Sequence, residues 1–134
     1  MIVVFLDTNI ALYSLSNDER KAETVDCLLS KRPFISVQVV NEFINVGLRK
    51  LGFSREEIYA LAVDLMKASR VVSLTEETVF SAMRIATRYK FSHWDSLIVA
   101  TAIQAQCNIL HSEDLQHGQK IEGLTILNPF APFP

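Results

Sequence analysis

Residues 2–9, with the sequence IVVFLDTN, decide the fold that is expected of this chain. The five apolar residues of this stretch are mostly β-branched or aromatic, which is typical of a short strand buried on both faces. The run ends at the carboxylate of Asp7, and the hydroxyl of Thr8 and the amide of Asn9 follow it. Because ligands of open α/β sheets bind at the carboxyl ends of the strands, we expect the other functional residues to gather around Asp7.

The alternation of strand and helix patterns continues along the chain. Short apolar runs predict further strands at residues 34–35, 70–74, 108–111 and 124–127. Apolar periodicity and capping residues predict helices at residues 9–15, 19–30, 37–50, 55–68, 75–89 and 94–106. Strands that alternate with helices form right-handed crossovers and a parallel sheet. We therefore predict a single three-layer α/β domain over residues 1–134, with a five-stranded, mostly parallel sheet and helices on both faces.

The composition restricts the class of protein. The formal net charge of the 134 residues is −2, so nucleic-acid binding would need a local basic patch or metal ions. Cys27 and Cys107 lie in apolar helical patterns without metal-ligand spacing, which predicts buried, reduced thiols and a cytoplasmic protein. We expect no signal peptide and no membrane span, because Asp7 interrupts the first apolar run and later runs are too short to cross a bilayer.

Two acidic positions in the first half of the chain stand out, and each has an alternative structural role. Asp7 is equally well placed to cap the helix that follows the first strand. Glu42 belongs to a polar stripe at helical spacing, formed with Gln38, Asn45 and Arg49. Such a stripe is commonly a solvated face, but two amides beside a single acid fit the rim of a binding site better than an ion-paired surface.

The second half of the chain contributes the other acidic candidates. Asp95 follows Ser92 by three residues, as the partner in a capping box does, and it lies at the start of the most apolar helix. Because that helix is expected to be central and buried, the carboxylate of Asp95 would lie near the edge of the sheet. Glu113 and Asp114 follow the fourth strand through Ser112, and they form either an acidic turn or part of a site.

A parallel sheet would bring these candidates to one edge. Asp7, Ser112 and Asp114 come from strand ends, Asp95 comes from a helix start, and Glu42 lies in the second turn of the helix after the second strand. Carboxylates that lie close together repel one another unless a cation is present. Oxygen ligands without His or Cys suit Mg²⁺ or Mn²⁺. The chemistry implied is metal-assisted attack of water on a phosphate ester.

Four segments resemble the acidic motifs of the PIN-domain family. They are DTN at residues 7–9, VVNEF at 39–43, WDSLI at 94–98 and LHSEDL at 110–115. The resemblance spans nearly the whole chain, and the size is similar to that of VapC-type toxins of toxin–antitoxin pairs. It implies a ribonuclease that depends on Mg²⁺ or Mn²⁺, leaves 5′-phosphate and 3′-hydroxyl ends, is usually a homodimer, and has an antitoxin partner.

The resemblance also assigns roles to individual residues. Asp7, Glu42 and Asp95 match the three most regular acidic positions of the family, and Asp114 matches the fourth. These four would be the catalytic and metal-binding residues. Ser112 matches the small hydroxyl residue two positions before the fourth acid.

Three further residues would support this site. Thr8 and Asn9 would orient Asp7 or bind water through hydrogen bonds. Glu113 is an additional acid beside Asp114, so two assignments remain open: either member of the pair faces the metal.

An RNA substrate would need contacts outside the acidic cluster. The basic candidates are Lys31, Arg32, Arg49, Lys50, Arg84, Arg88, Lys90 and His93. Tyr89 and Trp94 are candidates for stacking on bases. Each of these residues has an ordinary alternative as a solvated cation or a core aromatic. The apolar residues 130–133 are either a surface for self-association or a partner, or a segment that packs on the domain.

Other classes of protein fit the sequence less well. A receiver domain needs paired acids at the first strand and a lysine after a late strand, whereas Asp7 stands alone. A haloacid-dehalogenase-like phosphatase needs a second aspartate where this chain has Asn9. A non-catalytic module that binds nucleic acid or protein is the remaining alternative, in which the acids are caps and surface residues.

Overall fold

The computed structural model describes residues 1–131 of the chain. Its strands are β1 (Val4–Leu6), β2 (Phe34–Ser36), β3 (Arg70–Val72), β4 (Ile109–His111), β5 (Lys120–Ile121) and β6 (Leu124–Leu127). Its helices are α1 (Thr8–Leu12), the 3₁₀ helix η1 (Tyr13–Leu15), α2 (Glu19–Leu29), α3 (Val37–Arg49), α4 (Arg55–Ala68), α5 (Glu76–Tyr89) and α6 (His93–Gln104). Strands and helices therefore alternate as the sequence predicts.

The strands form one sheet in the order β3-β2-β1-β4-β6-β5. All neighbouring pairs are parallel except β5 and β6, which form an antiparallel hairpin. The prediction of five strands was wrong, because the sequence pattern predicts a polar loop over residues 112–120 and no strand before residue 124, whereas β5 begins at Lys120. This strand has only two residues, and its turn has positive φ at both Glu122 and Gly123, at 48° and 88°. Since the turn lacks the usual Asn-Gly or Asp-Gly pair, no local pattern marks the hairpin.

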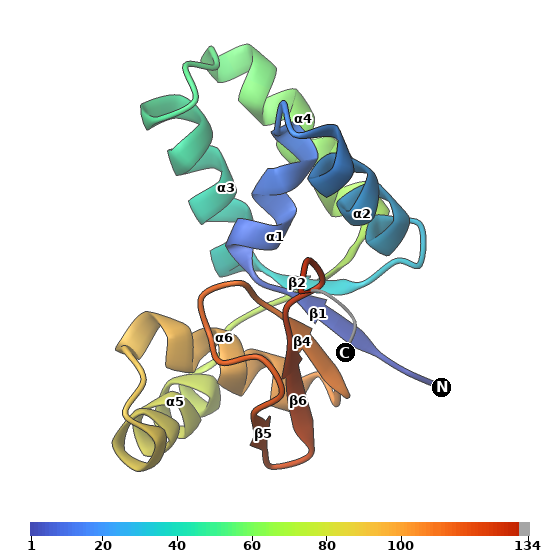
Figure 1. Ribbon diagram of the computed structural model, residues 1–134. Coiled ribbons are helices and arrows are strands. Elements are labelled where there is room, and N and C mark those ends of the chain that lie inside the picture. Colours follow the sequence, from blue (N-terminus) through green and yellow to red (C-terminus); the bar gives the residue numbers. More distant parts are fainter. Residues whose placement is uncertain (132–134) are drawn as a thin grey trace.

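Helices cover both faces of the sheet, which confirms the three-layer α/β prediction. Figure 1 shows α1, α2, α3 and α4 on one side, and α5 and α6 on the other. The middle residues of the strands, among them Phe5, Ile35 and Leu110, are fully buried. Helix α6 is buried from Ser96 to Ala102, as expected from its apolar sequence. This arrangement directs the carboxyl ends of β1, β2 and β4 toward one edge of the sheet.

Two expectations about burial were wrong. Cys27 is exposed, because it lies on the outer side of α2, whereas Cys107 is buried. On α5, Val79 and Met83 are 38% and 47% exposed, although the periodicity predicted that they face inward. Helix α5 instead packs through Thr78, Ala82 and Ile85, so its outer face is unusually apolar.

The last described residues lie against the first helices. The ring of Phe130 packs edge-on against Tyr13, with centroids 5.0 Å apart. The rest of the apolar tail, residues 132–134, lies outside the described part of the chain. No helix within residues 1–131 is both long enough and apolar enough to cross a bilayer.

Candidate active site

Asp7 connects the first strand to the first helix. Its backbone N–H donates to the carbonyl of His111 at 3.0 Å, which ties the end of β1 to the end of β4. Its carboxylate caps α1, because Oδ1 accepts from the Thr8 N–H at 2.7 Å. The other oxygen, Oδ2, accepts from the Ser112 hydroxyl at 2.9 Å. The same carboxylate therefore caps α1 and also contacts the residue that follows β4.

Burial perturbs the ionisation of Asp7. The side chain is almost completely covered, and this burial raises the pKa of its carboxyl to about 6, although hydrogen bonds from Ser112 and Thr8 oppose the shift. The negative charges of Asp95 and Asp114 raise the same pKa further. These three carboxylates are therefore close enough to repel one another, as expected for groups that share a cation when one is bound.

Asp95 comes from the first turn of α6. The hydroxyl of Ser92 caps this helix by accepting from the Asp95 N–H at 3.1 Å. In the described part of the chain, the carboxylate of Asp95 does not return a hydrogen bond to the Ser92 N–H, so the capping box is only half formed. The half-buried carboxylate is thus available to the cluster with Asp7 and Asp114.

Asp114 and Glu113 point to different surroundings. The side-chain amide of Asn9 donates to the Asp114 carboxylate. Burial, Asp95 and Glu113 raise the pKa of Asp114. Glu113 instead accepts from the hydroxyl of Tyr13 and forms an ion pair of 3.3 Å with Lys21. The geometry therefore directs Asp114 toward the cluster and leaves Glu113 beside it.

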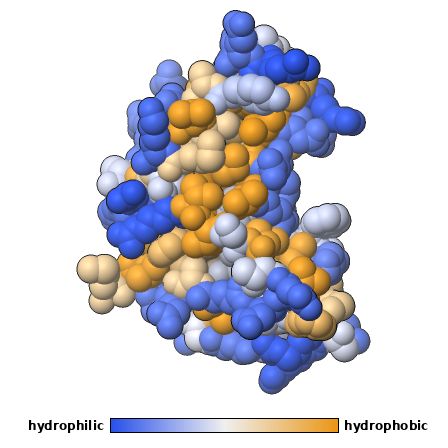
Figure 2. All heavy atoms as spheres, turned by 180° about the vertical axis from the view of Figure 1, so that it is seen from behind, coloured by the Kyte–Doolittle hydropathy of each residue, from blue (hydrophilic) through white to orange (hydrophobic). Residues whose placement is uncertain are grey.

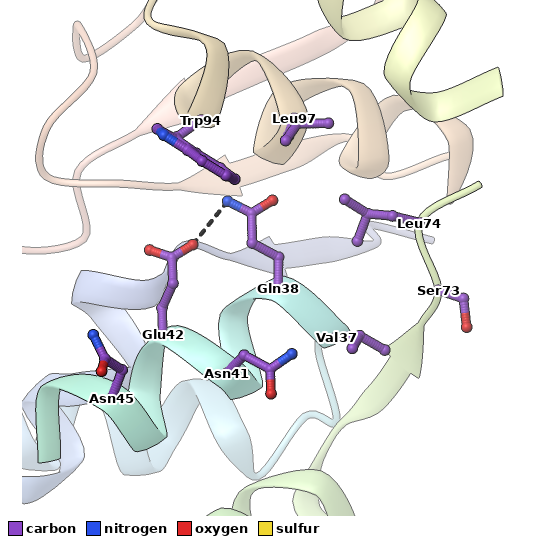
Figure 3. A pocket seen from close by; sticks show the side chains of 9 residues that line it. All are labelled: Val37, Gln38, Asn41, Glu42, Asn45, Ser73, Leu74, Trp94 and Leu97. Carbon is purple, nitrogen blue, oxygen red and sulfur yellow. Dashed lines mark hydrogen bonds between the residues drawn. The ribbon is translucent and has the colours of Figure 1, made fainter. Parts of the chain in front are cut away.

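Glu42 lies on the opposite wall of the site region. Its Oε1 accepts from the Gln38 side-chain amide at 2.7 Å, and the two residues belong to α3. Figure 3 shows both side chains facing Trp94, the neighbour of Asp95, across a groove of about 840 Å³. Glu42 does not contribute to the pKa shifts of Asp7 or Asp114. The structure thus brings Asp7, Asp95 and Asp114 close enough for their charges to interact, whereas Glu42 lies in a groove that none of the three aspartates lines.

The donor set fits a hard divalent ion that keeps some of its water. Within residues 1–131, no three His, Cys, Asp or Glu side chains are close enough to enclose an ion by themselves. Mg²⁺ does not need such a cage, because it commonly binds one or two carboxylates and retains several waters. The Thr8 hydroxyl is buried without a hydrogen-bond partner, so a polar atom beside Asp7 is left for a further ligand. One or two of the carboxylates of Asp7, Asp95 and Asp114, completed by water, therefore fit an ion of this kind.

Four of the eight basic candidates, Arg49, Arg84, Arg88 and His93, have different environments. Arg84 forms two hydrogen bonds with Glu122, at 2.8 and 3.2 Å, so much of its charge is compensated. Arg88 is exposed and lies over the ring of Tyr89, 5.3 Å from its centroid. Arg49 is exposed in the last turn of α3, and His93 is exposed at the start of α6. Of these four, His93 is the one adjacent in sequence to the groove-lining Trp94.

A model of the PIN domain matches residues 4–120 of the sequence. The chain belongs to the PIN domain family. A search of curated proteins gives no significant match. The four acidic motifs of the sequence thus lie within a recognised PIN domain.

Several solved structures share this PIN fold. A toxin–antitoxin complex from Klebsiella pneumoniae has a TM-score of 0.72 at 16% identity, over 95% of this chain and 98% of that one. DNA-bound VapBC from Salmonella typhimurium has a TM-score of 0.71 at 19% identity, over 94% and 97%. VapC20 from Mycobacterium tuberculosis, described as a Sarcin-Ricin loop cleaving toxin, has a TM-score of 0.66 at 19% identity, over 83% and 89%. These likenesses show the fold.

Sequence reasoning missed two residues beside this site, Tyr13 and Lys21, and gave a third, Gln38, no specific partner. Tyr13 and Lys21 hold Glu113, and Gln38 holds Glu42. Gln38 was visible as a member of the polar stripe, since it precedes Glu42 by one helical turn. Tyr13 and Lys21 had no such signal, because their partner lies about a hundred residues away in the sequence.

Proposed function

We propose that this PIN domain is an endoribonuclease that depends on Mg²⁺ or Mn²⁺ and hydrolyses phosphodiester bonds of RNA. The observation that carries the proposal is the convergence of Asp7, Asp95 and Asp114 at the carboxyl edge of the sheet, where burial and, to a smaller extent, the charges of Asp95 and Asp114 raise the pKa of Asp7. A buried carboxylate with two other acids close to it is costly to the fold, and an ion that offsets this cost is the simplest reason to keep them together.

The residues around the cluster have distinct roles in this proposal. Asp7, Asp95 and Asp114 hold the ion, and Glu42 reaches it through water. A divalent ion bound there supplies positive charge for the phosphate oxygens and lowers the pKa of water. Ser112 and Thr8 keep the Asp7 carboxylate in one orientation through hydrogen bonds to its two oxygens.

Asn9 acts on the other side of the cluster. Asp114 lies in the turn after β4, and the side-chain amide of Asn9 fixes its carboxylate by donating a hydrogen bond to it. Thr8, Asn9 and Ser112 are thus positioning residues in this proposal. Glu113 supports the turn through its bonds to Tyr13 and Lys21 and does not bind the ion.

The proposal includes an antitoxin partner and a homodimer, both in the cytoplasm. It is supported by the fold, because one structural neighbour is described as a toxin–antitoxin complex. A dimer is also favoured by the apolar outer surface along edge strand β3 and the helices before and after it. Exposed apolar residues of these three elements are Tyr59, Val63, Met66, Val71, Val79, Phe80 and Met83. Figure 2 shows a band of hydrophobic side chains crossing the back of the molecule, and large exposed patches of this kind commonly mark interfaces.

The activity can be tested with a mixed RNA pool. Purified protein is incubated with Mg²⁺, with Mn²⁺ and with EDTA, alongside Asp7→Asn and Asp95→Asn. The matched control is Asp26→Asn, which removes an exposed acid of α2 on the surface. We expect cleavage with either metal in wild type and in the control, and none in EDTA or in the two site variants.

Two other results of the cleavage assay would contradict the proposal. Cleavage that is the same in wild type and in both site variants would assign the activity to another site or to a contaminant. No cleavage together with no Mn²⁺ binding by calorimetry would favour the non-catalytic binding module.

A further inference from the structure

A groove of about 840 Å³ that includes Glu42 is not explained by metal binding. One wall is the outer face of α3, and the other is formed by the segment after β3 and by the first turns of α6. Figure 3 shows Trp94 and Leu97 facing Gln38 and Glu42 across this groove. Glu42, one of the proposed site residues, lines the groove, and Trp94 directly precedes Asp95 in the sequence.

Trp94 is the distinctive residue of the groove. It is the only tryptophan of the chain, and 67% of its surface is exposed. Its ring lies edge-on to the imidazole of His93, with centroids 5.8 Å apart. Exposing the largest apolar side chain has a cost in water, whereas an indole ring is a good stacking platform for any nucleobase.

The facing wall supplies hydrogen-bonding groups without positive charge. Gln38, Asn41 and Asn45 place three amides along α3. Of the residues that line the groove, only Glu42 carries a formal charge, and it is negative. Such a surface repels phosphate, whereas amides offer both donors and acceptors to the edge of an uncharged base.

Gln38 gives an independent indication of a ligand. A carboxylate can only accept, so the hydrogen bond to Glu42 requires the amide nitrogen of Gln38 to point at it. The amide oxygen is then left buried without a hydrogen-bond partner. Figure 3 shows this amide directly opposite the ring of Trp94. Because this oxygen is covered, an N–H group of a ligand could pair with it only after the Gln38 amide turns toward the groove.

From these observations we infer that the groove is a subsite for an unpaired nucleobase of the RNA substrate. One base next to the cleaved phosphate stacks on Trp94, and the amides of Gln38, Asn41 and Asn45 bind its edge. The inference rests on the proposed function, since it assigns the groove to the same substrate. It makes single-stranded RNA the preferred substrate class, because a paired base cannot enter the groove.

The single tryptophan allows a direct test that does not depend on cleavage. Single-stranded RNA octamers are titrated into Asp7→Asn in Mg²⁺, while tryptophan fluorescence reports stacking and the anisotropy of a 3′-labelled octamer reports binding. The controls are an abasic octamer with the same backbone and an RNA duplex. We expect saturable quenching by the single strand, and little quenching by either control.

Two results would overturn the inference. Equal quenching by the abasic octamer would show that bases are not recognised. Binding by anisotropy without any change in fluorescence would place the RNA elsewhere and leave the groove to a protein partner. Neither result would affect the metal-dependent cleavage by wild type, so failure of the subsite and failure of the nuclease proposal are distinguishable.

Variants then test the role in catalysis. Removing one base stack by Trp94→Ala should raise KM for a short RNA roughly tenfold with little change in kcat, and Trp94→Phe should restore most of the loss. Asn41→Ala and Asn45→Ala should change the preference among octamers of different bases, whereas Asn17→Ala, in an exposed turn, should not. A Trp94→Ala enzyme with unchanged KM would contradict the proposed subsite.

Discussion

The hydroxyl of Ser112 donates a hydrogen bond of 2.9 Å to Oδ2 of Asp7, and both groups are buried. The two residues follow neighbouring parallel strands, β4 and β1, and are 105 positions apart in the sequence. This bond orients the central carboxylate of the site, while the Thr8 N–H holds its other oxygen. The ion-binding geometry proposed above therefore depends on how two strand ends meet.

Ser112→Ala should weaken the site without unfolding the protein. Groups that orient a metal ligand typically contribute about 10- to 100-fold to metal affinity or activity, so a loss in that range is expected. The loss is measured as the affinity for Mn²⁺ by calorimetry and as the rate of RNA cleavage. Ser112→Thr, which keeps the hydroxyl, should lose less. Equal losses in both variants would indicate a packing effect and contradict the orienting role.

Asp7→Asn should stabilise the metal-free protein at neutral pH. Burial raises the pKa of Asp7 from 3.8 to about 6, so ionising this group costs more in the folded than in the unfolded chain. The protonated form of Asp7 therefore favours the folded state. This contribution to the free energy of unfolding is complete below pH 3.8 and is lost as the pH rises through about 6. The full cost is on the order of 3 kcal/mol in the free energy of unfolding. Thermal unfolding in EDTA should therefore show a higher Tm for the variant at pH 7.5 and a smaller difference at pH 5.

Bound metal should reverse the order of the Tm values of wild type and Asp7→Asn. Mg²⁺ or Mn²⁺ should raise the Tm of wild type by binding only the folded state, and should leave Asp7→Asn nearly unchanged. An exposed control, Asp26→Asn, should respond to metal as wild type does. If metal raised the Tm of Asp7→Asn as much as that of wild type, the ion would bind elsewhere.

Asp114→Asn and Glu113→Gln should separate the two neighbouring acids. Asp114 lies within the charge cluster, so its neutralisation should abolish metal-dependent cleavage. Glu113 is held by Tyr13 and Lys21, and breaking this partly exposed ion pair should cost no more than about 1 kcal/mol of stability. Cleavage assays and urea unfolding of both variants test this. The reverse pattern, with Glu113→Gln inactive and Asp114→Asn active, would assign the ion to Glu113.

The two cysteines should differ in reactivity. Cys27 is exposed, whereas burial raises the pKa of the Cys107 thiol to about 11. Because the thiolate is the reactive form, a thiol reagent at pH 8 should modify Cys27 quickly and Cys107 only after unfolding. Cys27→Ser should remove the fast phase, and Cys107→Ser should leave it. A fast phase that survives in Cys27→Ser would mean that Cys107 becomes accessible in the native state.

Local features of the sequence were sufficient to predict most of the architecture. The order of strands and helices, the capping box at Ser54 and the buried α6 depend on residues close together in the chain, and all three are present in the structure. The inward face of α5 was not predictable in this way. Thr78 is buried there, where it binds Gln104 of α6, while the more apolar Val79 and Met83 face outward.

The sequence by itself determined the α/β alternation and the acidic residues available at the strand and helix ends, because periodicity and capping are short-range properties. Only the tertiary structure decided which of these residues meet. It pairs Asp7 with Ser112, directs Asp114 to Asn9, and leaves Glu113 to Tyr13. Each of these partners lies 100 or 105 residues away, and the parallel pairing of β1 with β4 brings them together. The exposure of Trp94 over its groove has the same origin, because α3 and α6 form its walls only after the sheet has assembled between the two helical layers.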